Sequence, residues 1–274
     1  MANLSQWLVT LRTREIISRV TNDPRSTGGT VLGVDFETAR NEAIGGGQAN
    51  FDEPWRDLTP EDRVLLYAYC NQQGHLEELI EAFRQLFRNS EPPVEPVIID
   101  LGCGPCTGGL AFTSILPDKS RFDYIGVDRS HAMRELGERL ASAAAEMNKT
   151  RRHWSADIPS VPWDDAPGWR PVIVIVSYLL ASPTLIPAKL IDQLESLLRR
   201  IGNGPVTVLY TNSNQPIANR SFPDFCDALT GIDFELCADD EGVIEIKRSQ
   251  GTTQRNLRYA LFYRPTQKNL KLGG

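Results

Sequence analysis

Two hydrophobic patterns divide the chain near residue 92. Before that point, apolar residues recur at helical spacing, and residues 1–20 predict one amphipathic helix. A further helical region begins with Thr59 as N-cap and Pro60 at the first helical position, and its apolar period continues through residues 75–89. Residues 21–50 are polar and interrupted by glycines, which predicts a long connection with a short helix within it.

After residue 92, short apolar runs alternate with amphipathic stretches. The runs predict strands at residues 96–100, 122–128, 150–157, 170–182, 205–213, 233–249 and 255–265. The stretches between them predict helices at residues 107–116, 130–147, 187–202 and 221–231. This alternation predicts an α/β fold with a doubly wound, mostly parallel sheet. We therefore divide the chain into an N-terminal helical cap, residues 1–92, and an α/β domain, residues 93–274.

Composition narrows the class of protein. The chain has 274 residues, 41% of them hydrophobic and 23% charged, as in ordinary globular proteins. We predict no membrane span, and we interpret the Arg-rich N-terminus as an amphipathic helix rather than a secretory signal or an organelle transit peptide. Five cysteines, an odd number, favour a reducing, cytoplasmic setting. Cys103 and Cys106 form a lone C-x-x-C and the three histidines are scattered, so we predict no metal site.

The segment VIIDLGCGPCTGGLAF, residues 97–112, joins the first predicted strand of the α/β domain to a helix. Gly102 and Gly104 permit a sharp turn and the close approach of a ligand to the backbone. The helix that starts near Thr107 directs free amides toward the same place. A dinucleotide fingerprint requires glycine where Thr107 stands, which disfavours a dehydrogenase.

Two acids end the first two strands of this domain. Asp100 is placed to hold an ammonium group, directly or through water, and Asp128 is placed to accept hydrogen bonds from two ribose hydroxyls. A ligand with an amino-acid end, a middle that contacts bare backbone and a nucleoside end fits this arrangement. That ligand is S-adenosylmethionine.

The same residues resemble the class I S-adenosylmethionine-dependent methyltransferases over about residues 97–265. DLGCGPCTG is similar to their first motif, D/E-x-G-x-G-x-G, with Cys106 in place of the third glycine; YIGVD matches the second motif, SADIP resembles the third, and IVSYLLAS lies where the fourth is found. The resemblance implies a Rossmann-like seven-stranded sheet of order 3-2-1-4-5-7-6. It also implies a cofactor site formed by Asp100, Gly102, Cys103, Gly104, Thr107, Asp128, Arg129, Asp157, Ile158 and Ser177.

The acceptor side is less defined. Tyr178, after the fourth strand, is our candidate for the catalytic residue that contacts the acceptor, and the amides of Asn212, Asn214 and Gln215 follow the fifth strand. We expect Tyr67, Tyr69 and His75 to lie on or near a helix that roofs the site. We interpret His131 and Met133 as helix or packing residues rather than adenine contacts.

Three functions remain open. The first is methyl transfer to a small molecule, which the acidic body of the chain favours. The second is methylation of RNA: residues 247–274 carry seven basic residues and no acid, and the fourth-motif strand is similar to that of a ribosomal small-subunit methyltransferase-like family. The third is a non-catalytic subunit that binds S-adenosylmethionine. A DNA amino-methyltransferase is disfavoured because SYLLAS lacks the proline pair found in those families, and neither Cys226 nor Cys237 is a convincing nucleophile. Glycines at 28, 29 and 45–47 suggest that the segment between them moves when substrate enters.

Overall fold

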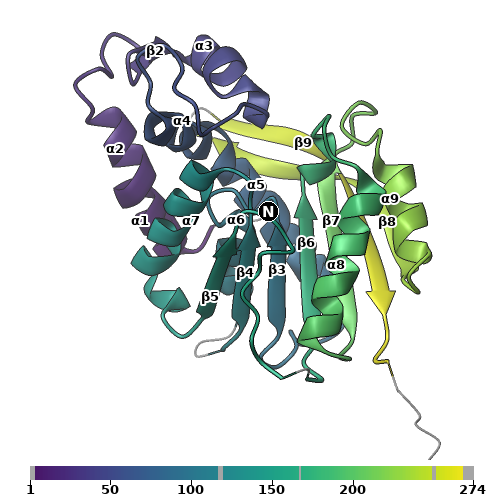
Figure 1. The fold of residues 1–274 in the computed structure, drawn as a ribbon. Helices are drawn as coiled ribbons and strands as arrows, with labels where there is room; N and C mark the ends of the chain where they lie inside the picture. The colour runs from purple at the N-terminus through teal and green to yellow at the C-terminus, as the bar shows by residue number, and fades with distance from the viewer. Residues whose placement is uncertain (1–3, 117–119, 167, 249–250, 268–274) are drawn as a thin grey trace, which may run out of the picture.

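One seven-stranded sheet organises the chain (Figure 1). The computed structural model describes residues 4–116, 120–166, 168–248 and 251–267. The strands of this sheet are β3 (Val97–Leu101), β4 (Asp123–Val127), β5 (Arg151–Ser155), β6 (Val172–Ser177), β7 (Val206–Ser213), β8 (Glu235–Arg248) and β9 (Gly251–Arg264). Their order is β5-β4-β3-β6-β7-β9-β8, which is 3-2-1-4-5-7-6 when the strands are counted along the chain. The predicted fold class and strand order are confirmed.

Within the described sheet, β9 alone runs opposite to the other strands. β9 pairs antiparallel with both β7 and β8, whereas β3 pairs parallel with β4 and β6. The order reverses beside β3, because the chain first builds outward through β4 and β5 and then returns to place β6 on the other side of β3. The carboxyl end of β3 is therefore the switch point, where open α/β sheets bind ligands.

Helices cover both faces of the sheet (Figure 1). They are α6 (Thr107–Ile115), α7 (His131–Ala143), α8 (Pro187–Ile201) and α9 (Phe222–Thr230). Alternate strand residues serve the two faces, as the pleat requires: Ile98 belongs to the core with α6 and α7, whereas Ile99 belongs to the core with α8 and α9. β3 is buried along its whole length, which explains its unbroken apolar sequence.

The N-terminal part combines helices with one small hairpin and several turns. Its elements are α1 (Gln6–Arg12), a π-helix (Thr13–Ile17), α2 (Ser18–Thr21), the hairpin β1 (Thr30–Val31) and β2 (Val34–Asp35), α3 (Phe36–Thr38), a second π-helix (Ala39–Ala43), a 3-10 helix (Gly45–Gly47), α4 (Pro60–Tyr67), a third π-helix (Ala68–Gln72) and α5 (Gln73–Leu86). The predicted helices are present, including the short one within residues 21–50. The hairpin was not predicted, because its two-residue strands leave no periodic signal.

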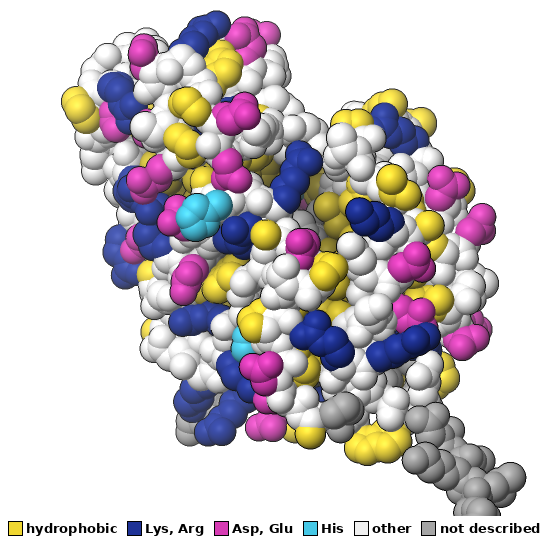
Figure 2. All heavy atoms as spheres, viewed as in Figure 1, with side chains coloured by type: hydrophobic (Ala, Val, Ile, Leu, Met, Phe, Trp, Pro, Cys, Tyr) yellow, Lys and Arg dark blue, Asp and Glu magenta, His cyan; other side chains and the backbone are white. Residues whose placement is uncertain are grey.

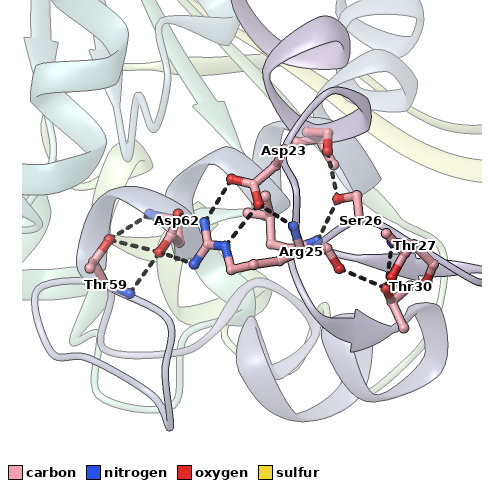
Figure 3. Close-up of polar contacts among 9 residues, drawn as sticks. Asp23, Arg25, Ser26, Thr27, Thr30, Thr59 and Asp62 are labelled. Carbon is pink, nitrogen blue, oxygen red and sulfur yellow. Dashed lines mark hydrogen bonds and ion pairs between the residues drawn. The ribbon is translucent and has the colours of Figure 1, made fainter.

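Local capping fixes where α4 begins. Thr59 and Asp62 form a capping box, in which the Thr59 hydroxyl accepts from the Asp62 amide and the Asp62 carboxylate accepts from the Thr59 amide. Arg25 binds Asp62 and Asp23 together, so that the connection after α2 is attached to the start of α4 (Figure 3). These pairs are partly exposed, and their role is to hold a long connection in one place rather than to supply much stability.

The N-terminal helices are continuous with the core of the sheet. Leu8, Leu66 and Phe83 belong to the same buried cluster as Phe112 and Tyr124. The rings of Phe83 on α5 and Phe112 on α6 lie 5.3 Å apart, edge to face. The cap is thus built onto one face of the sheet. No helix in the described part of the chain is long and apolar enough to cross a membrane.

Candidate functional site

A cavity of about 1170 Å³ lies at the carboxyl ends of the parallel strands, between the sheet and the N-terminal helices. The space-filling view shows the molecule hollowed between the N-terminal lobe and the β7 side of the sheet (Figure 2). Its walls come from the loops after β3, β4, β5, β6 and β7, from β9, and from residues 46–52, Tyr67, Asn71 and His75 of the cap. Its volume exceeds that of most sites for a single small ligand, so it can hold two reactants.

The glycine-containing loop after β3 forms the floor of one half of this cavity. Gly102 and Gly104 have φ angles of 70° and 50°, in the left-handed region that glycine adopts without strain. Cys106 has a φ of 61° at the N-cap of α6. It stands where the methyltransferase motif has its third glycine, and the backbone there keeps the conformation that glycine would adopt. The buried Cys106 thiol is inert, since burial raises the pKa of this group to about 12.

Asp128 lies directly against this loop. Its Oδ2 accepts from the Gly104 amide at 2.9 Å and its Oδ1 accepts from the Ser130 amide at 2.9 Å. Each carboxylate oxygen retains capacity for another donor, and Asp128 lines the cavity. Burial raises the pKa of Asp128, while the two amides oppose that shift. The carboxylate is therefore poorly solvated and gains from additional hydrogen-bond donors.

Asp100 lies beneath the loop and does not line the cavity, so of the two predicted contacts with an ammonium group, direct or through water, the direct one is not available. The side chain is only 2% exposed, and its Oδ2 accepts from the Tyr124 hydroxyl at 2.8 Å and from the Gly108 amide at 3.1 Å. A Cβ at Gly108 would lie 2.5 Å from that oxygen, so only glycine lets α6 approach the strand this closely. Asp100 holds the start of α6 in place.

Most of the other predicted cofactor residues line the cavity. The lining set is Gly102, Gly104, Asp128, Arg129, Asp157, Ile158 and Ser177. Cys103 and Thr107 are buried in the loop and do not line it. Asp157 is exposed, and its Oδ1 accepts from the Ser160 amide at 2.9 Å, which fixes the turn after β5. The ends of β3, β4 and β5 thus meet in one half of the cavity, which we call the cofactor half because residues predicted to bind the cofactor line it.

The other half, which we call the acceptor half, contains Tyr178 and His75. Tyr178 follows β6 with a φ of 58°, an unfavourable conformation for a tyrosine, and its amide donates to the Thr211 carbonyl at 2.9 Å. Its ring stacks on His75 of α5, with 4.3 Å between the centroids and 23° between the planes. The Tyr67 hydroxyl lies 3.4 Å from Nδ1 of His75. Both Tyr67 and His75 therefore roof the site as predicted, whereas Tyr69 does not line the cavity.

A charged pair borders the cavity at Arg255, and the sequence did not predict this pairing. Arg255 of β9 donates to Glu78 of α5 at 2.5 Å, and Glu78 is 1% exposed. The pKa of Arg255 is held up by Glu78 and by Tyr178, against the opposing effect of burial. The pairing joins residues 177 positions apart, and no local sequence pattern reports such a contact.

Residues 50–52 of the cap also border the cofactor half, and sequence reasoning missed them. The Asp52 carboxylate accepts from the Ser130 hydroxyl and from the amides of His131 and Ala132, at 2.9, 3.0 and 2.9 Å. It thereby caps α7 from a distant part of the chain. Phe51 packs edge to face on Tyr67, with 5.5 Å between the ring centroids.

Some of the remaining predicted residues line the cavity and others do not. Asn214, Gln215 and Met133 line the cavity, whereas Asn212 is buried and donates to Tyr210 and Ala218. His131 is exposed and lies outside it. In the described residues, no group of three or more His, Cys, Asp or Glu side chains is arranged to hold a metal ion.

The strand order, the turn after β3 and the acid after β4 together make a Rossmann-like architecture. No family model matches the sequence, and no curated protein matches it either. Solved structures with a similar fold include a SAM-dependent methyltransferase from Methanosarcina mazei, at 15% identity over 66% of this chain and 98% of that one, with a TM-score of 0.43.

Two further solved structures are similar to this chain. Geranyl diphosphate methyltransferase, solved with GPP and sinefungin, is 12% identical over 74% of this chain and 81% of its own, with a TM-score of 0.43. Precorrin 8w decarboxylase from Methanobacterium thermoautotrophicum is 16% identical over 69% and 90%, with a TM-score of 0.46. At such distances the function has to be argued from this chain's own residues.

Proposed function

We propose that the protein is an S-adenosylmethionine-dependent methyltransferase that acts on a small-molecule acceptor. The observation that carries the proposal is the hydrogen bond between the Gly104 amide and the Asp128 carboxylate, which brings the turn after β3 and the acid after β4 together at the switch point. A nucleoside needs this pairing of open backbone and a ribose-binding carboxylate.

The residues of the cofactor half fit S-adenosylmethionine. Asp128 would hold the ribose hydroxyls, since it lines the cavity and its oxygens retain acceptor capacity. The backbone at Gly102 and Gly104 leaves room for the amino-acid portion, and Asp157 with Ile158 would border the adenine. Bound there, the cofactor supplies an activated methyl group on a sulfonium that carries its own leaving group. The protein has to orient the acceptor and exclude water.

The acceptor half supports a small acceptor. Tyr178 and His75 offer aromatic faces, Asn214 and Gln215 offer amides, and residues 1–92 act as the cap that closes over them. Tyr178 is the residue we assign to contact the acceptor. The basic C-terminal segment is less suited to RNA than its composition indicates, because Arg255 is paired with Glu78 and Arg258 with Asp239. Lys268 and Lys271, the other residues of that prediction, lie outside the described residues.

Calorimetric titration with S-adenosylmethionine, S-adenosylhomocysteine and NAD tests the cofactor. We expect micromolar binding of the first two and none of NAD. Asp128→Ala should abolish binding, whereas Asp192→Asn, which changes an exposed acid of α8, should leave it unchanged. Binding of NAD alone would overturn the proposal, as would full affinity in Asp128→Ala.

Transfer of a radioactive methyl group separates the enzyme from a binding subunit. Incubation with pools of small metabolites and with total RNA should label a product in the small-molecule pools. Labelling of RNA alone would select the RNA alternative. Cofactor binding with no transfer to either pool would select the non-catalytic subunit.

A further inference from the structure

A buried glutamine connects the cap to the cofactor loop. Gln72, at the end of the π-helix that separates α4 from α5, is 0% exposed. Its Nε2 donates to the Pro105 carbonyl at 3.0 Å. Pro105 lies between Gly104 and Cys106, both of which have positive φ angles. The contact therefore reaches the loop at the residue between two positions of positive φ.

An arginine from the first helix fixes the glutamine. Arg12 is 3% exposed, although it carries a charge. Its Nε donates to the Gln72 Oε1 at 3.3 Å, its Nη1 to the Gln73 Oε1 at 3.1 Å and its Nη2 to the Ala68 carbonyl at 3.2 Å. The planar guanidinium thus holds the Gln72 carboxamide with its oxygen toward Arg12 and its NH₂ group toward the loop.

The π-helical geometry makes this arrangement possible. In a π-helix the carbonyls bond five residues onward, and the extra residue in the turn redirects the side chains that follow. The π-helix Ala68–Gln72 ends at Gln72, and the π-helix Thr13–Ile17 begins directly after Arg12. Such insertions cost stability and are frequent at functional sites. Arg12 joins the two π-helices, because it directly precedes Thr13–Ile17 and hydrogen-bonds to Ala68 and Gln72 of the other.

We propose that Gln72 is a positioning residue of the cofactor site, which acts on the Pro105 carbonyl and is itself oriented by Arg12. The proposal rests on the proposed function. A continuous series of hydrogen bonds runs from Arg12 to Gln72 to Pro105. The amide of Gly104, the residue before Pro105, donates to Asp128. The N-terminal helix and the cofactor are then energetically coupled, although Arg12 and Gln72 do not line the cavity.

The chain offers a matched control for this relay. Gln73 is the adjacent residue of the same type and also accepts from Arg12, but its Nε2 donates to Glu77 rather than to the loop. Gln72→Met removes both contacts of Gln72. Gln72→Glu keeps an acceptor for Arg12 and removes the donor to Pro105. Gln73→Met removes a contact of Arg12 and leaves the donor to Pro105 in place.

Two measurements on the full-length protein decide the matter. We expect the dissociation constant for S-adenosylhomocysteine to rise about tenfold in both Gln72 variants and to stay within about twofold in Gln73→Met. Urea unfolding gives the free energy of unfolding of each variant. If Gln72 positions the loop, the order of the variants in stability should differ from their order in dissociation constant, and Gln72→Glu should show this difference. Unchanged affinity in both Gln72 variants, or a rise in all three that follows the loss of stability, would overturn the proposal.

Hydrogen exchange of the protein without ligand provides a readout that does not depend on the proposed function. The Gly104 and Thr107 amides, which donate to Asp128 and to the Cys103 carbonyl, should exchange faster in Gln72→Glu than in Gln73→Met. If the wild-type protein binds no S-adenosylhomocysteine, the proposed function fails and this comparison alone tests the positioning role. Equal exchange in the two variants would refute it.

Discussion

The His75 ring stacks on the Tyr178 ring at 4.3 Å, and this contact joins the cap to the carboxyl end of β6. Tyr178 has a φ of 58°, a conformation that its neighbours have to enforce. The amide of Tyr178 is tied to the Thr211 carbonyl, and its ring is covered by His75. The acceptor half of the cavity is therefore built jointly by the cap and the sheet.

We expect Tyr178→Ala to separate acceptor binding from cofactor binding. Without the ring, the acceptor loses an aromatic face and His75 loses its partner, so turnover of the acceptor found by the transfer screen should fall at least about tenfold. The affinity for S-adenosylhomocysteine should change less than about threefold, because Tyr178 lies on the acceptor side. Tyr178→Phe keeps the stack and reports the hydroxyl separately. Full turnover in Tyr178→Ala would remove this residue from the site.

The Glu78–Arg255 pair should behave as a coupled unit. Glu78 is buried, so Arg255→Met alone leaves a carboxylate without its guanidinium and should destabilise the fold by roughly 2 to 4 kcal/mol. The double variant Glu78→Leu/Arg255→Met should recover much of that loss, because both charges are removed together. Urea unfolding of the two singles and the double gives the coupling energy. Additive losses would show that the pair is not coupled.

Much of the architecture could be predicted from sequence because its signals are local. The apolar runs at β3 and β6 show strands buried on both faces, and Thr59 with Pro60 marks the start of α4. The acid after β4 was found because parallel strands bring their carboxyl ends to one edge. Asp128 and Tyr178 line the cavity as that rule requires.

Contacts across the chain could not be predicted in this way. Asp52 reaches α7 from a polar connection, and Gln72 reaches the loop because of a π-helix that no periodicity reveals. Asp100 has the position of a ligand-binding acid at the end of a strand. The orientation of its side chain depends on Tyr124, 24 residues later, whose hydroxyl donates to the Asp100 carboxyl group. Which hydrogen-bond partner a residue at the end of a strand finds therefore depends on tertiary contacts.

Asp52→Ala should loosen the cap over the cofactor half. The variant leaves the amides of His131 and Ala132 without their acceptor while Ser130 remains the N-cap of α7, and losing a side-chain acceptor at a helix N-terminus costs about 1 kcal/mol. Stability should fall by about that amount in urea, and S-adenosylhomocysteine should bind more weakly. Asp57→Ala, in the same connection and exposed, is the control. If limited proteolysis of residues 30–44, between the two groups of glycines, is unchanged by ligand in the wild type, that segment does not move on binding.

Asp100→Asn should flatten the dependence of stability on pH. Burial raises the pKa of Asp100 to about 7, although the hydroxyl of Tyr124 and the amide of Gly108 oppose the shift. An unfolded aspartate titrates near pH ~3.9, so below that value both states are protonated and the wild type has its full stability. Between about pH 4 and 7 the unfolded state releases its proton and the folded state does not, so the wild type loses stability as the pH rises.

The asparagine variant keeps an acceptor for Tyr124 and has no proton to release. Its free energy of unfolding, measured in urea from pH 4 to 8, should therefore rise relative to that of the wild type across this window. Parallel curves for the two proteins would show that Asp100 is ionised in the fold, and Asp192→Asn should give such a parallel curve as the exposed control.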